Sequence, residues 1–235
     1  MRLLSAPRLA LALVVSTGLA ACAPSIDPAV KADFDRRLSQ LPTNEETYPP
    51  SESYLPLSFA VGQWTRHRVR DTKGAQLITN KLVGRDSGGY WMESEIESYE
   101  GKEWGKMHVA LLGGRDASGA EILELSVRKN DSPIIVDVRG DDLAAARAQY
   151  GYLIDLLAIV FESDIKDDVR VPGGHFIGCY KFETGRPWGP WQKGSLVCAH
   201  PSVPLSGVVR ALPLDASGSL ELVGFGAAGA DEATQ

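Results

Sequence analysis

Residue patterns that mark common catalytic and metal-binding sites are missing from this sequence. It has no Gly-x-Ser-x-Gly nucleophile motif, no phosphate-binding glycine loop ending in Lys and Ser or Thr, and no His-Glu-x-x-His pair. Its four histidines stand apart, without a second ligand at a metal-binding spacing; they are His67, His108, His175 and His200. No residue stands out as a nucleophile. We therefore expect no catalytic residue, no metal and no cofactor.

Basic charge and long internal hydrophobic runs are also scarce. Lysine and arginine number 24 against 30 aspartates and glutamates, which gives a net charge of −6 at pH 7. This balance argues against nucleic acid as a partner and against a basic surface for lipid headgroups. A helix needs about 20 apolar residues to cross a bilayer, and the richest internal run, from Tyr150 to Phe161, is interrupted by Asp155.

What the sequence does contain begins with an export signal. Arg2 and Arg8 form a basic start, residues 9–15 are wholly apolar, and small residues follow. A basic segment, a short apolar segment and a small-residue cleavage site are typical of a signal peptide, which here covers residues 1–21. The apolar segment is too short for a stable membrane span.

The end of this signal, Leu19-Ala-Ala-Cys22, resembles the lipobox of bacterial lipoproteins position by position. The resemblance implies lipid attachment at Cys22, cleavage before it, and a mature chain of 22–235 with net charge −8 (−6 − 2). Two or three acyl chains anchor a protein firmly to a bilayer. Ala23 in place of Asp favours the periplasmic face of the outer membrane. An ordinary signal peptide with a chance cysteine is the alternative.

The chain has three cysteines, and the number left after lipid attachment bears on whether a disulfide forms. If Cys22 carries lipid, Cys179 and Cys198 remain. Because an exported compartment is oxidising, an even remainder suggests one disulfide. A hairpin that pairs these two residues would turn between Trp188 and Gly189, within a stretch rich in glycine and proline. Two buried free thiols are the alternative.

The N-terminal part of the mature chain, residues 22–58, predicts a lipidated tether, a short helix and a proline-rich linker. Asp27 can cap the helix, with Pro28 at its first position. Its apolar residues then recur at helical spacing, at Val30, Phe34, Leu38 and Leu41. We expect a single domain over 59–228 and a disordered tail over 229–235.

From residue 61 onward the pattern alternates with period two, which predicts an antiparallel meander. We expect strands near 62–70, 76–84, 90–97, 104–112, 121–128, 134–139, 175–183, 193–200, 205–212 and 219–225. Between the two groups of strands, residues 142–163 carry a wide apolar stripe at helical spacing. A single helix after six strands must bury that stripe against the sheet. Asp141-Asp142 and Asp167-Asp168 bracket this helix as caps or solvated charges.

This order of elements resembles the lipoprotein-localisation proteins LolA and LolB and their half-barrel relatives. Residues 61–64 (Val-Gly-Gln-Trp) and 200–207 also resemble segments of bacterial envelope lipoproteins of that shape. The resemblance implies a mainly β (α+β) fold, in which a strongly curved antiparallel sheet or half-barrel of about ten or eleven strands wraps a central helix. Such folds leave an apolar cavity for acyl chains.

Two of the five tryptophans lie in the Gly/Pro turn, where burial is difficult. Trp188 and Trp191 could form a rim for a ligand, a lipid interface or a protein partner. Trp64, Trp91 and Trp104 lie in predicted strands, where core packing is the simplest explanation.

The favoured interpretation is a membrane-anchored envelope lipoprotein that binds a hydrophobic small molecule or a lipidated partner in a half-barrel cavity. The first alternative is a structural or assembly lipoprotein, acting through strand edges or the Trp188–Trp191 loop. The least favoured is an enzyme that uses a cavity carboxylate or histidine. Neighbouring strands could bring His67 and His108 together, but the sequence alone does not show it.

Overall fold

The computed structural model describes residues 27–52, 57–72, 74–111, 120–130, 132–145, 147, 163–184 and 194–227. The described part contains a helix, α1 (Pro28–Ser39), and one sheet of twelve strands. The strands are β1 (Thr47–Tyr48), β2 (Trp64–Asp71), β3 (Gly74–Arg85), β4 (Tyr90–Ser98), β5 (Gly101–Leu111), β6 (Ala120–Lys129), β7 (Val136–Val138), β8 (Lys166–Val171), β9 (Gly174–Thr184), β10 (Ser195–Ala199), β11 (Val208–Pro213) and β12 (Ser219–Gly226).

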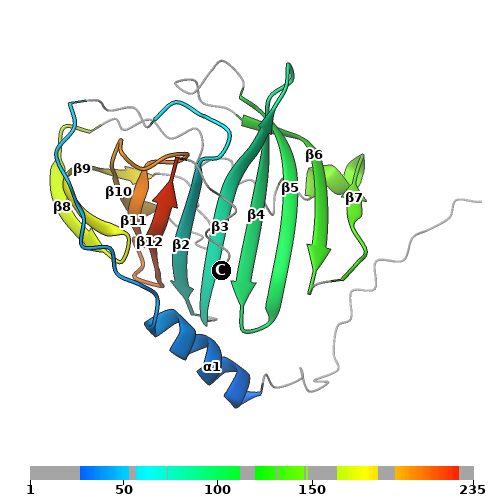
Figure 1. Ribbon diagram of the computed structural model, residues 1–235, viewed down its shortest axis with the longest axis horizontal. Coiled ribbons are helices and arrows are strands. Elements are labelled where there is room, and N and C mark those ends of the chain that lie inside the picture. The colour runs from blue at the N-terminus through cyan, green and yellow to red at the C-terminus, as the bar shows by residue number, and fades with distance from the viewer. Residues whose placement is uncertain are drawn as a thin grey trace, which may run out of the picture.

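The sheet is open, and its strand order is β1-β9-β10-β11-β12-β2-β3-β4-β5-β6-β7, with β8 also paired to β9 (Figure 1). All pairings are antiparallel except the short parallel contact between β1 and β9. The prediction of a mainly β fold with an antiparallel sheet is therefore confirmed. The last strand, β12, pairs with β2, which joins the two halves of the chain into one continuous sheet.

One end of the sheet curls back on itself. β8 pairs with β9 and also contacts β11 and β12. The curl encloses a second apolar cluster, centred on Phe176, whose ring is fully buried. Gly178, in the middle of β9, has a φ of +70°, a left-handed conformation that glycine adopts without strain.

The strands alternate between two faces, as their period of two requires. On β2, Thr65, His67 and Val69 are buried on one side, and the intervening arginines point to the other. We call the first side the inner face, because it carries the largest apolar cluster of the described residues. Its members are Val69, Ile78, Leu82, Met92, Met107, Val109, Ile122, Leu125, Tyr180, Val197, Ala199, Leu205, Val208, Ala211 and Leu220.

The helix α1 covers part of the opposite, outer face. Asp27 caps it by accepting a hydrogen bond from the Ala29 amide at 2.8 Å, and Pro28 occupies its first turn. Its buried residues, Phe34 and Leu38, pack against Leu77 and Val223 of the sheet. The predicted cap and start of this helix are confirmed, and so is its apolar stripe from Phe34 to Leu41, whereas Val30 is exposed.

The predicted central helix is described only at its beginning. Residues 141–145 and 147 are helical, so the predicted start near 142 is confirmed to within one residue. The remainder of the predicted helix lies outside the described residues. Asp167 and Asp168 are not caps of that helix but lie within β8. There, Asp168 accepts a hydrogen bond from the Gly178 amide at 2.9 Å.

The predicted disulfide between Cys179 and Cys198 is not present, and both are buried free thiols. The predicted hairpin register is wrong by two residues, because Cys198 lies opposite Lys181. Cys179 is therefore a diagonal neighbour, at a typical Cα separation of about 7–8 Å, beyond the usual range for a disulfide. Burial raises the pKa of the Cys179 thiol to about 12, with a smaller contribution from Cys198.

Candidate functional site

Segments outside the sheet reach onto the inner face. Phe59, which precedes β2, and Leu143, from the helical residues after β7, pack against its apolar cluster. Arg147 donates from Nη2 to the carbonyl oxygen of Ile122 at 2.8 Å and pairs with Glu121 at 2.7 Å. These contacts attach the start of the helical segment to β6.

A short polar row crosses the middle of the apolar inner face. Thr65 lies opposite Asn80, Asn80 opposite Ser94, and Ser94 opposite Gly105, on the successive strands β2 to β5. The three polar side chains are buried. Asn80 Oδ1 and Ser94 Oγ are buried and have no hydrogen-bond partner. Among the described residues that carry such an unpartnered atom, Asn80 and Ser94 are the pair that lies directly opposite across two strands.

This row was not identified from the sequence, although a signal exists. Asn80 stands between Ile78 and Leu82, and Ser94 between Met92 and Ile96, in the inward positions of strands β3 and β4. A polar residue flanked at i−2 and i+2 by buried apolar residues is a departure from the alternation expected of a sheet with one apolar face.

Gly105, at the end of the row, is buried and places no side chain beside Ser94. A Cβ built on Gly105 would come no closer than 3.9 Å to any atom outside its immediate chain neighbours, the nearest being Ser126 O. Glycine in a strand interior often marks a place where another group approaches closely, and the contact of 3.9 Å is an ordinary van der Waals distance.

His67, near the row on β2, is fully buried and neutral. Burial lowers the pKa of its imidazole from 6.5 to about 4, and the hydrogen bond to Val208 opposes this shift only in part. Its Nε2 donates to the carbonyl oxygen of Val208 at 3.0 Å. His67 therefore adds no positive charge to the inner face at pH 7.

Charged groups are largely excluded from the buried part of the inner face. Among the described residues that are buried, Glu97 is the one carboxylate, and there is no lysine or arginine. Glu97 belongs to the outer face, where Arg37 of α1 donates to it. The charged pair at the end of the inner face is Glu103 with Lys129, whose Oε2 and Nζ atoms are 3.4 Å apart.

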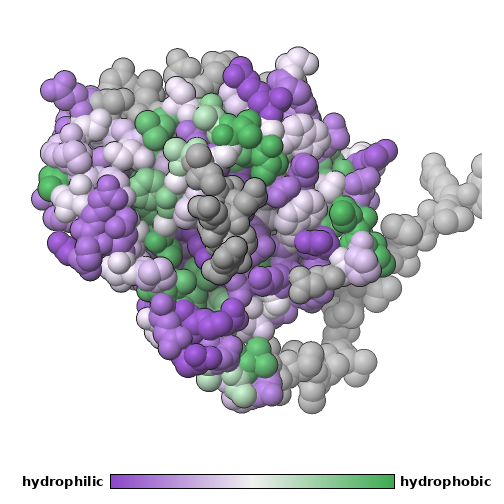
Figure 2. All heavy atoms as spheres, viewed as in Figure 1, coloured by the Kyte–Doolittle hydropathy of each residue, from purple (hydrophilic) through white to green (hydrophobic). Residues whose placement is uncertain are grey.

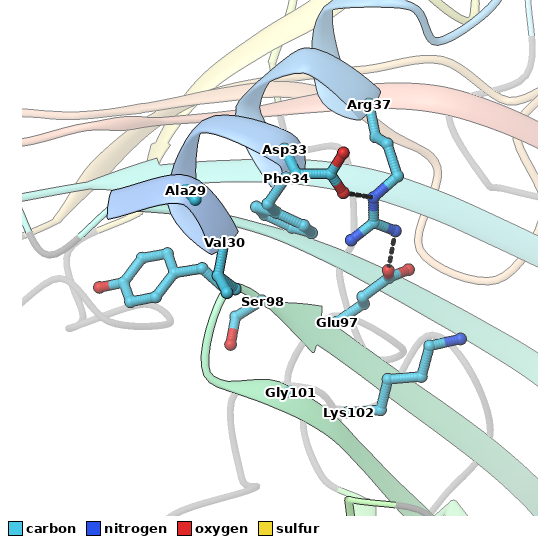
Figure 3. A pocket seen from close by; sticks show the side chains of 10 residues that line it. Ala29, Val30, Asp33, Phe34, Arg37, Glu97, Ser98, Gly101 and Lys102 are labelled. Atoms are coloured by element: carbon cyan, nitrogen blue, oxygen red, sulfur yellow. Dashed lines mark hydrogen bonds and ion pairs between the residues drawn. The ribbon is translucent and has the colours of Figure 1, made fainter. Parts of the chain in front are cut away.

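A groove of about 580 Å³ lies between α1 and the β4–β5 turn (Figure 3). Phe34, Asp33 and Arg37 point from the helix toward the sheet. The charges that line it are paired, because Arg37 contacts both Asp33 and Glu97, and Lys102 contacts Glu95. Figure 2 shows a mostly hydrophilic surface over α1, with a hydrophobic patch near its N-terminal end. This groove is the place where the helix packs on the sheet. Because its charged side chains are paired, none of them needs a ligand as a partner.

A second polar cluster, on the outer face, surrounds His108 of β5. The His108 and Trp91 rings stack with centroids 4.5 Å apart, and Asp86 accepts from His108 Nε2 at 3.1 Å and from Trp91 Nε1 at 2.9 Å. The backbone amide of Gly88 also donates to Asp86. These bonds hold the β3–β4 turn against β5. His67 and His108 lie on opposite faces of the sheet, so the strands do not bring them together, which the sequence had left open.

The β7 edge of the sheet exposes apolar side chains. Ile134, Ile135 and Val136 are 68%, 53% and 53% exposed. β7 pairs with β6 on one side and ends the strand order on the other. An edge of this kind can pair with a further strand.

The remaining residues singled out from the sequence, Cys22, Trp188 and Trp191, lie outside the described residues. Within the described part of the chain, no group of three or more His, Cys, Asp or Glu residues is arranged to hold a metal. No helix among those residues is long and apolar enough to cross a bilayer. Comparison with known proteins found no matching family, no matching curated protein and no matching solved structure.

Proposed function

We propose that the protein is an envelope lipoprotein, anchored through lipid on Cys22, that binds a hydrophobic small molecule on the inner face of its sheet. In this proposal the sheet forms a half-barrel around the helix that begins at residue 141. The proposal is supported above all by one observation. Two buried, unpartnered polar atoms, Asn80 Oδ1 and Ser94 Oγ, lie on directly opposite residues in the middle of a mostly apolar face.

The energetic argument concerns the cost of leaving such atoms unpaired. A buried donor or acceptor without a partner costs about 1–3 kcal/mol, and buried polar groups in native proteins are almost always satisfied. A bound ligand that supplies the partner would recover this cost. The apolar residues around the row, with Met92 and Met107 among them, suit a flexible hydrocarbon because methionine adapts its shape to its neighbours.

Placing a side chain at Gly105, opposite Ser94, is expected to weaken ligand binding while the strand still forms. In Gly105→Val the added Cβ is at ordinary van der Waals distances from Ser126 O and Leu125 Cδ1, and valine favours strands over glycine. We expect the affinity for the uncharged fluorescent probe N-phenyl-1-naphthylamine to fall at least about tenfold, an energy of about 1.4 kcal/mol. The measurement is a fluorescence titration of the mature chain carrying Cys22→Ser, purified without detergent.

The control is Gly84→Ala, another glycine replacement, in strand β3, which β4 separates from β5. Its Cβ would contact the Trp91 ring at 3.5 Å, on the side of the sheet where Trp91 stacks with His108. This control is expected to bind the probe as the parent chain does. Equal loss in both variants, or no saturable binding by the parent chain, would contradict the proposed function.

The anchor is tested separately in the producing cell. Cys22→Ser removes the thiol that would carry the diacylglyceryl group, so we expect incorporation of labelled palmitate to be lost. The full-length variant should then no longer fractionate with membranes. Undiminished labelling of the variant would rule out Cys22 as the attachment site.

A further inference from the structure

The inner face also constrains the chemistry of its ligand, and this inference rests on the proposed function. We infer that the ligand is an uncharged amphiphile whose head carries an O–H or N–H donor, bound by Asn80 and Ser94. Its hydrocarbon tail lies against the apolar residues that surround the polar row.

The hydrogen-bonding requirement follows from the two side chains of the row. Asn80 Oδ1 is an acceptor, and Ser94 Oγ can both donate and accept; neither has a partner. Because Asn80 and Ser94 are directly opposite in the β3–β4 register, their Cβ atoms lie about 5 Å apart. A single hydroxyl or amide can therefore donate to Asn80 and accept from Ser94 at the same time.

The charge of the head follows from what surrounds the row. A buried carboxylate needs a paired cation or several donors, and the buried residues described here include no lysine or arginine. The nearby imidazole, His67, is held neutral by its burial at pH 7. A cationic head would likewise find no buried carboxylate at the row, because Glu97, the one carboxylate among the buried residues described, lies on the outer face and is paired with Arg37.

The ion pair of Glu103 and Lys129, at the end of the inner face, is the alternative site for a ligand with a charged head. Lys129 is 70% exposed at its side chain and is 3.4 Å from Glu103. Glu103 lies opposite Ile96, which packs on the inner cluster. A fatty acid could place its carboxylate beside Lys129 with its tail directed inward. The affinity order of charged and uncharged ligands therefore distinguishes the polar row from the end of the face.

The test compares three probes of equal chain length: 1-dodecanol, dodecyl methyl ether and dodecanoate. Each displaces N-phenyl-1-naphthylamine from the mature chain carrying Cys22→Ser at pH 8. We expect the alcohol to bind about tenfold more tightly than the ether, which accepts but cannot donate, and more tightly still than the carboxylate. In Asn80→Leu the alcohol should lose this advantage while the fluorescent probe still binds. Ser94→Ala, which removes a single oxygen, should reduce the advantage and serves as the milder variant.

Each other outcome overturns the inference in an identifiable way. Equal binding of alcohol and ether by the parent chain would remove the donor requirement and leave the proposed function standing. Tightest binding by dodecanoate, weakened in Lys129→Gln, would move the head to the end of the inner face. An unchanged preference for the alcohol in both Asn80→Leu and Ser94→Ala would show that the polar row does not hold the head. Absence of any saturable binding would remove the proposed function as well.

Discussion

Lowering the pH from 7 to 4 is expected to reduce the free energy of unfolding by about 3 kcal/mol through His67 alone. The folded-state pKa of His67 is lowered to about 4 from an ordinary value of 6.5, mainly by burial. As the pH falls below 6.5, His67 binds a proton in the unfolded chain but not in the folded chain. This difference favours unfolding by about 1.4 kcal/mol for each pH unit. The loss begins near pH 6.5 and ends near pH 4.

Two other groups with shifted pKa values also affect how stability changes with pH. His200 adds to the loss between pH 6.5 and 4, and Asp86 acts at lower pH. The pKa of His200 is also lowered by burial, so His200 contributes a loss of the same sign below pH 6.5. The pKa of Asp86 is lowered by its hydrogen bonds from Gly88 and Trp91, so its contribution is lost only below about 3.8. Acid destabilisation between pH 6.5 and 4 therefore reports the buried imidazoles and not this carboxylate.

Urea unfolding at pH 7 and pH 4.5 measures this effect. His67→Gln retains an amide N–H that can donate to Val208 but has no group that titrates in this range, so its pH dependence should be flatter than that of the parent chain by about 2–3 kcal/mol. Asp33→Asn, at a half-exposed position of α1, should leave the slope between these pH values unchanged. A variant at His67 that keeps the full slope would show that this residue is not the buried neutral base described here.

Truncating Phe176 is expected to give the largest loss of stability from a single substitution. Its ring is fully buried, stacks on Tyr48 with centroids 4.6 Å apart, and packs near Phe225 and His200. Removing a buried phenylalanine side chain costs about 3–5 kcal/mol, from lost burial and the cavity left behind. Because Tyr48 belongs to β1, the parallel pairing of β1 with β9 should loosen at the same time.

Equilibrium unfolding of Phe176→Ala in urea, with hydrogen exchange of the Tyr48 amide, tests both parts of this prediction. Leu214→Ala provides the control, because Leu214 is 52% exposed and a surface change of this kind costs less than about 0.5 kcal/mol. A loss below about 1 kcal/mol for Phe176→Ala would mean that the curled end of the sheet contributes little to stability.

The parts of the fold that are predictable from the sequence are those set by local signals. The cap at Asp27, the proline after it and the spacing of Phe34 and Leu38 act within one helix, so α1 was predicted almost to the residue. The long strands β2 to β6 were predicted because alternation with one buried face is a local pattern.

The errors lie where distant segments decide the structure. β1 is two residues long and exists only because it lies beside β9, more than a hundred residues further along the chain. β8 carries two aspartates that suggested the end of a helix, and its pairing with β9 is fixed by Gly178 and Asp168. The register of the β9–β10 hairpin was predicted by placing Cys179 opposite Cys198. In the structure Cys198 lies opposite Lys181, two residues away from that register.

The sequence predicts the apolar face of the candidate site but not its polar row, because the row depends on how distant segments pair. An apolar inner face follows from alternation, but the row from Thr65 to Gly105 arises from the register of four strands, which no single segment specifies. Once that register is known, Asn80 and Ser94 become neighbours, and their missing partners become the main argument for a ligand.

The most direct test of the central claim is the position of a bound ligand. Crystals of the mature chain carrying Cys22→Ser, grown with 12-bromo-1-dodecanol, would locate the bromine by its anomalous scattering. We expect the hydroxyl within hydrogen-bond distance, about 2.7–3.0 Å, of Asn80 Oδ1 and Ser94 Oγ, with the bromine farther along the apolar inner face. A ligand found only in the groove beside α1 or at the β7 edge, or an inner face with no ligand, would contradict the account.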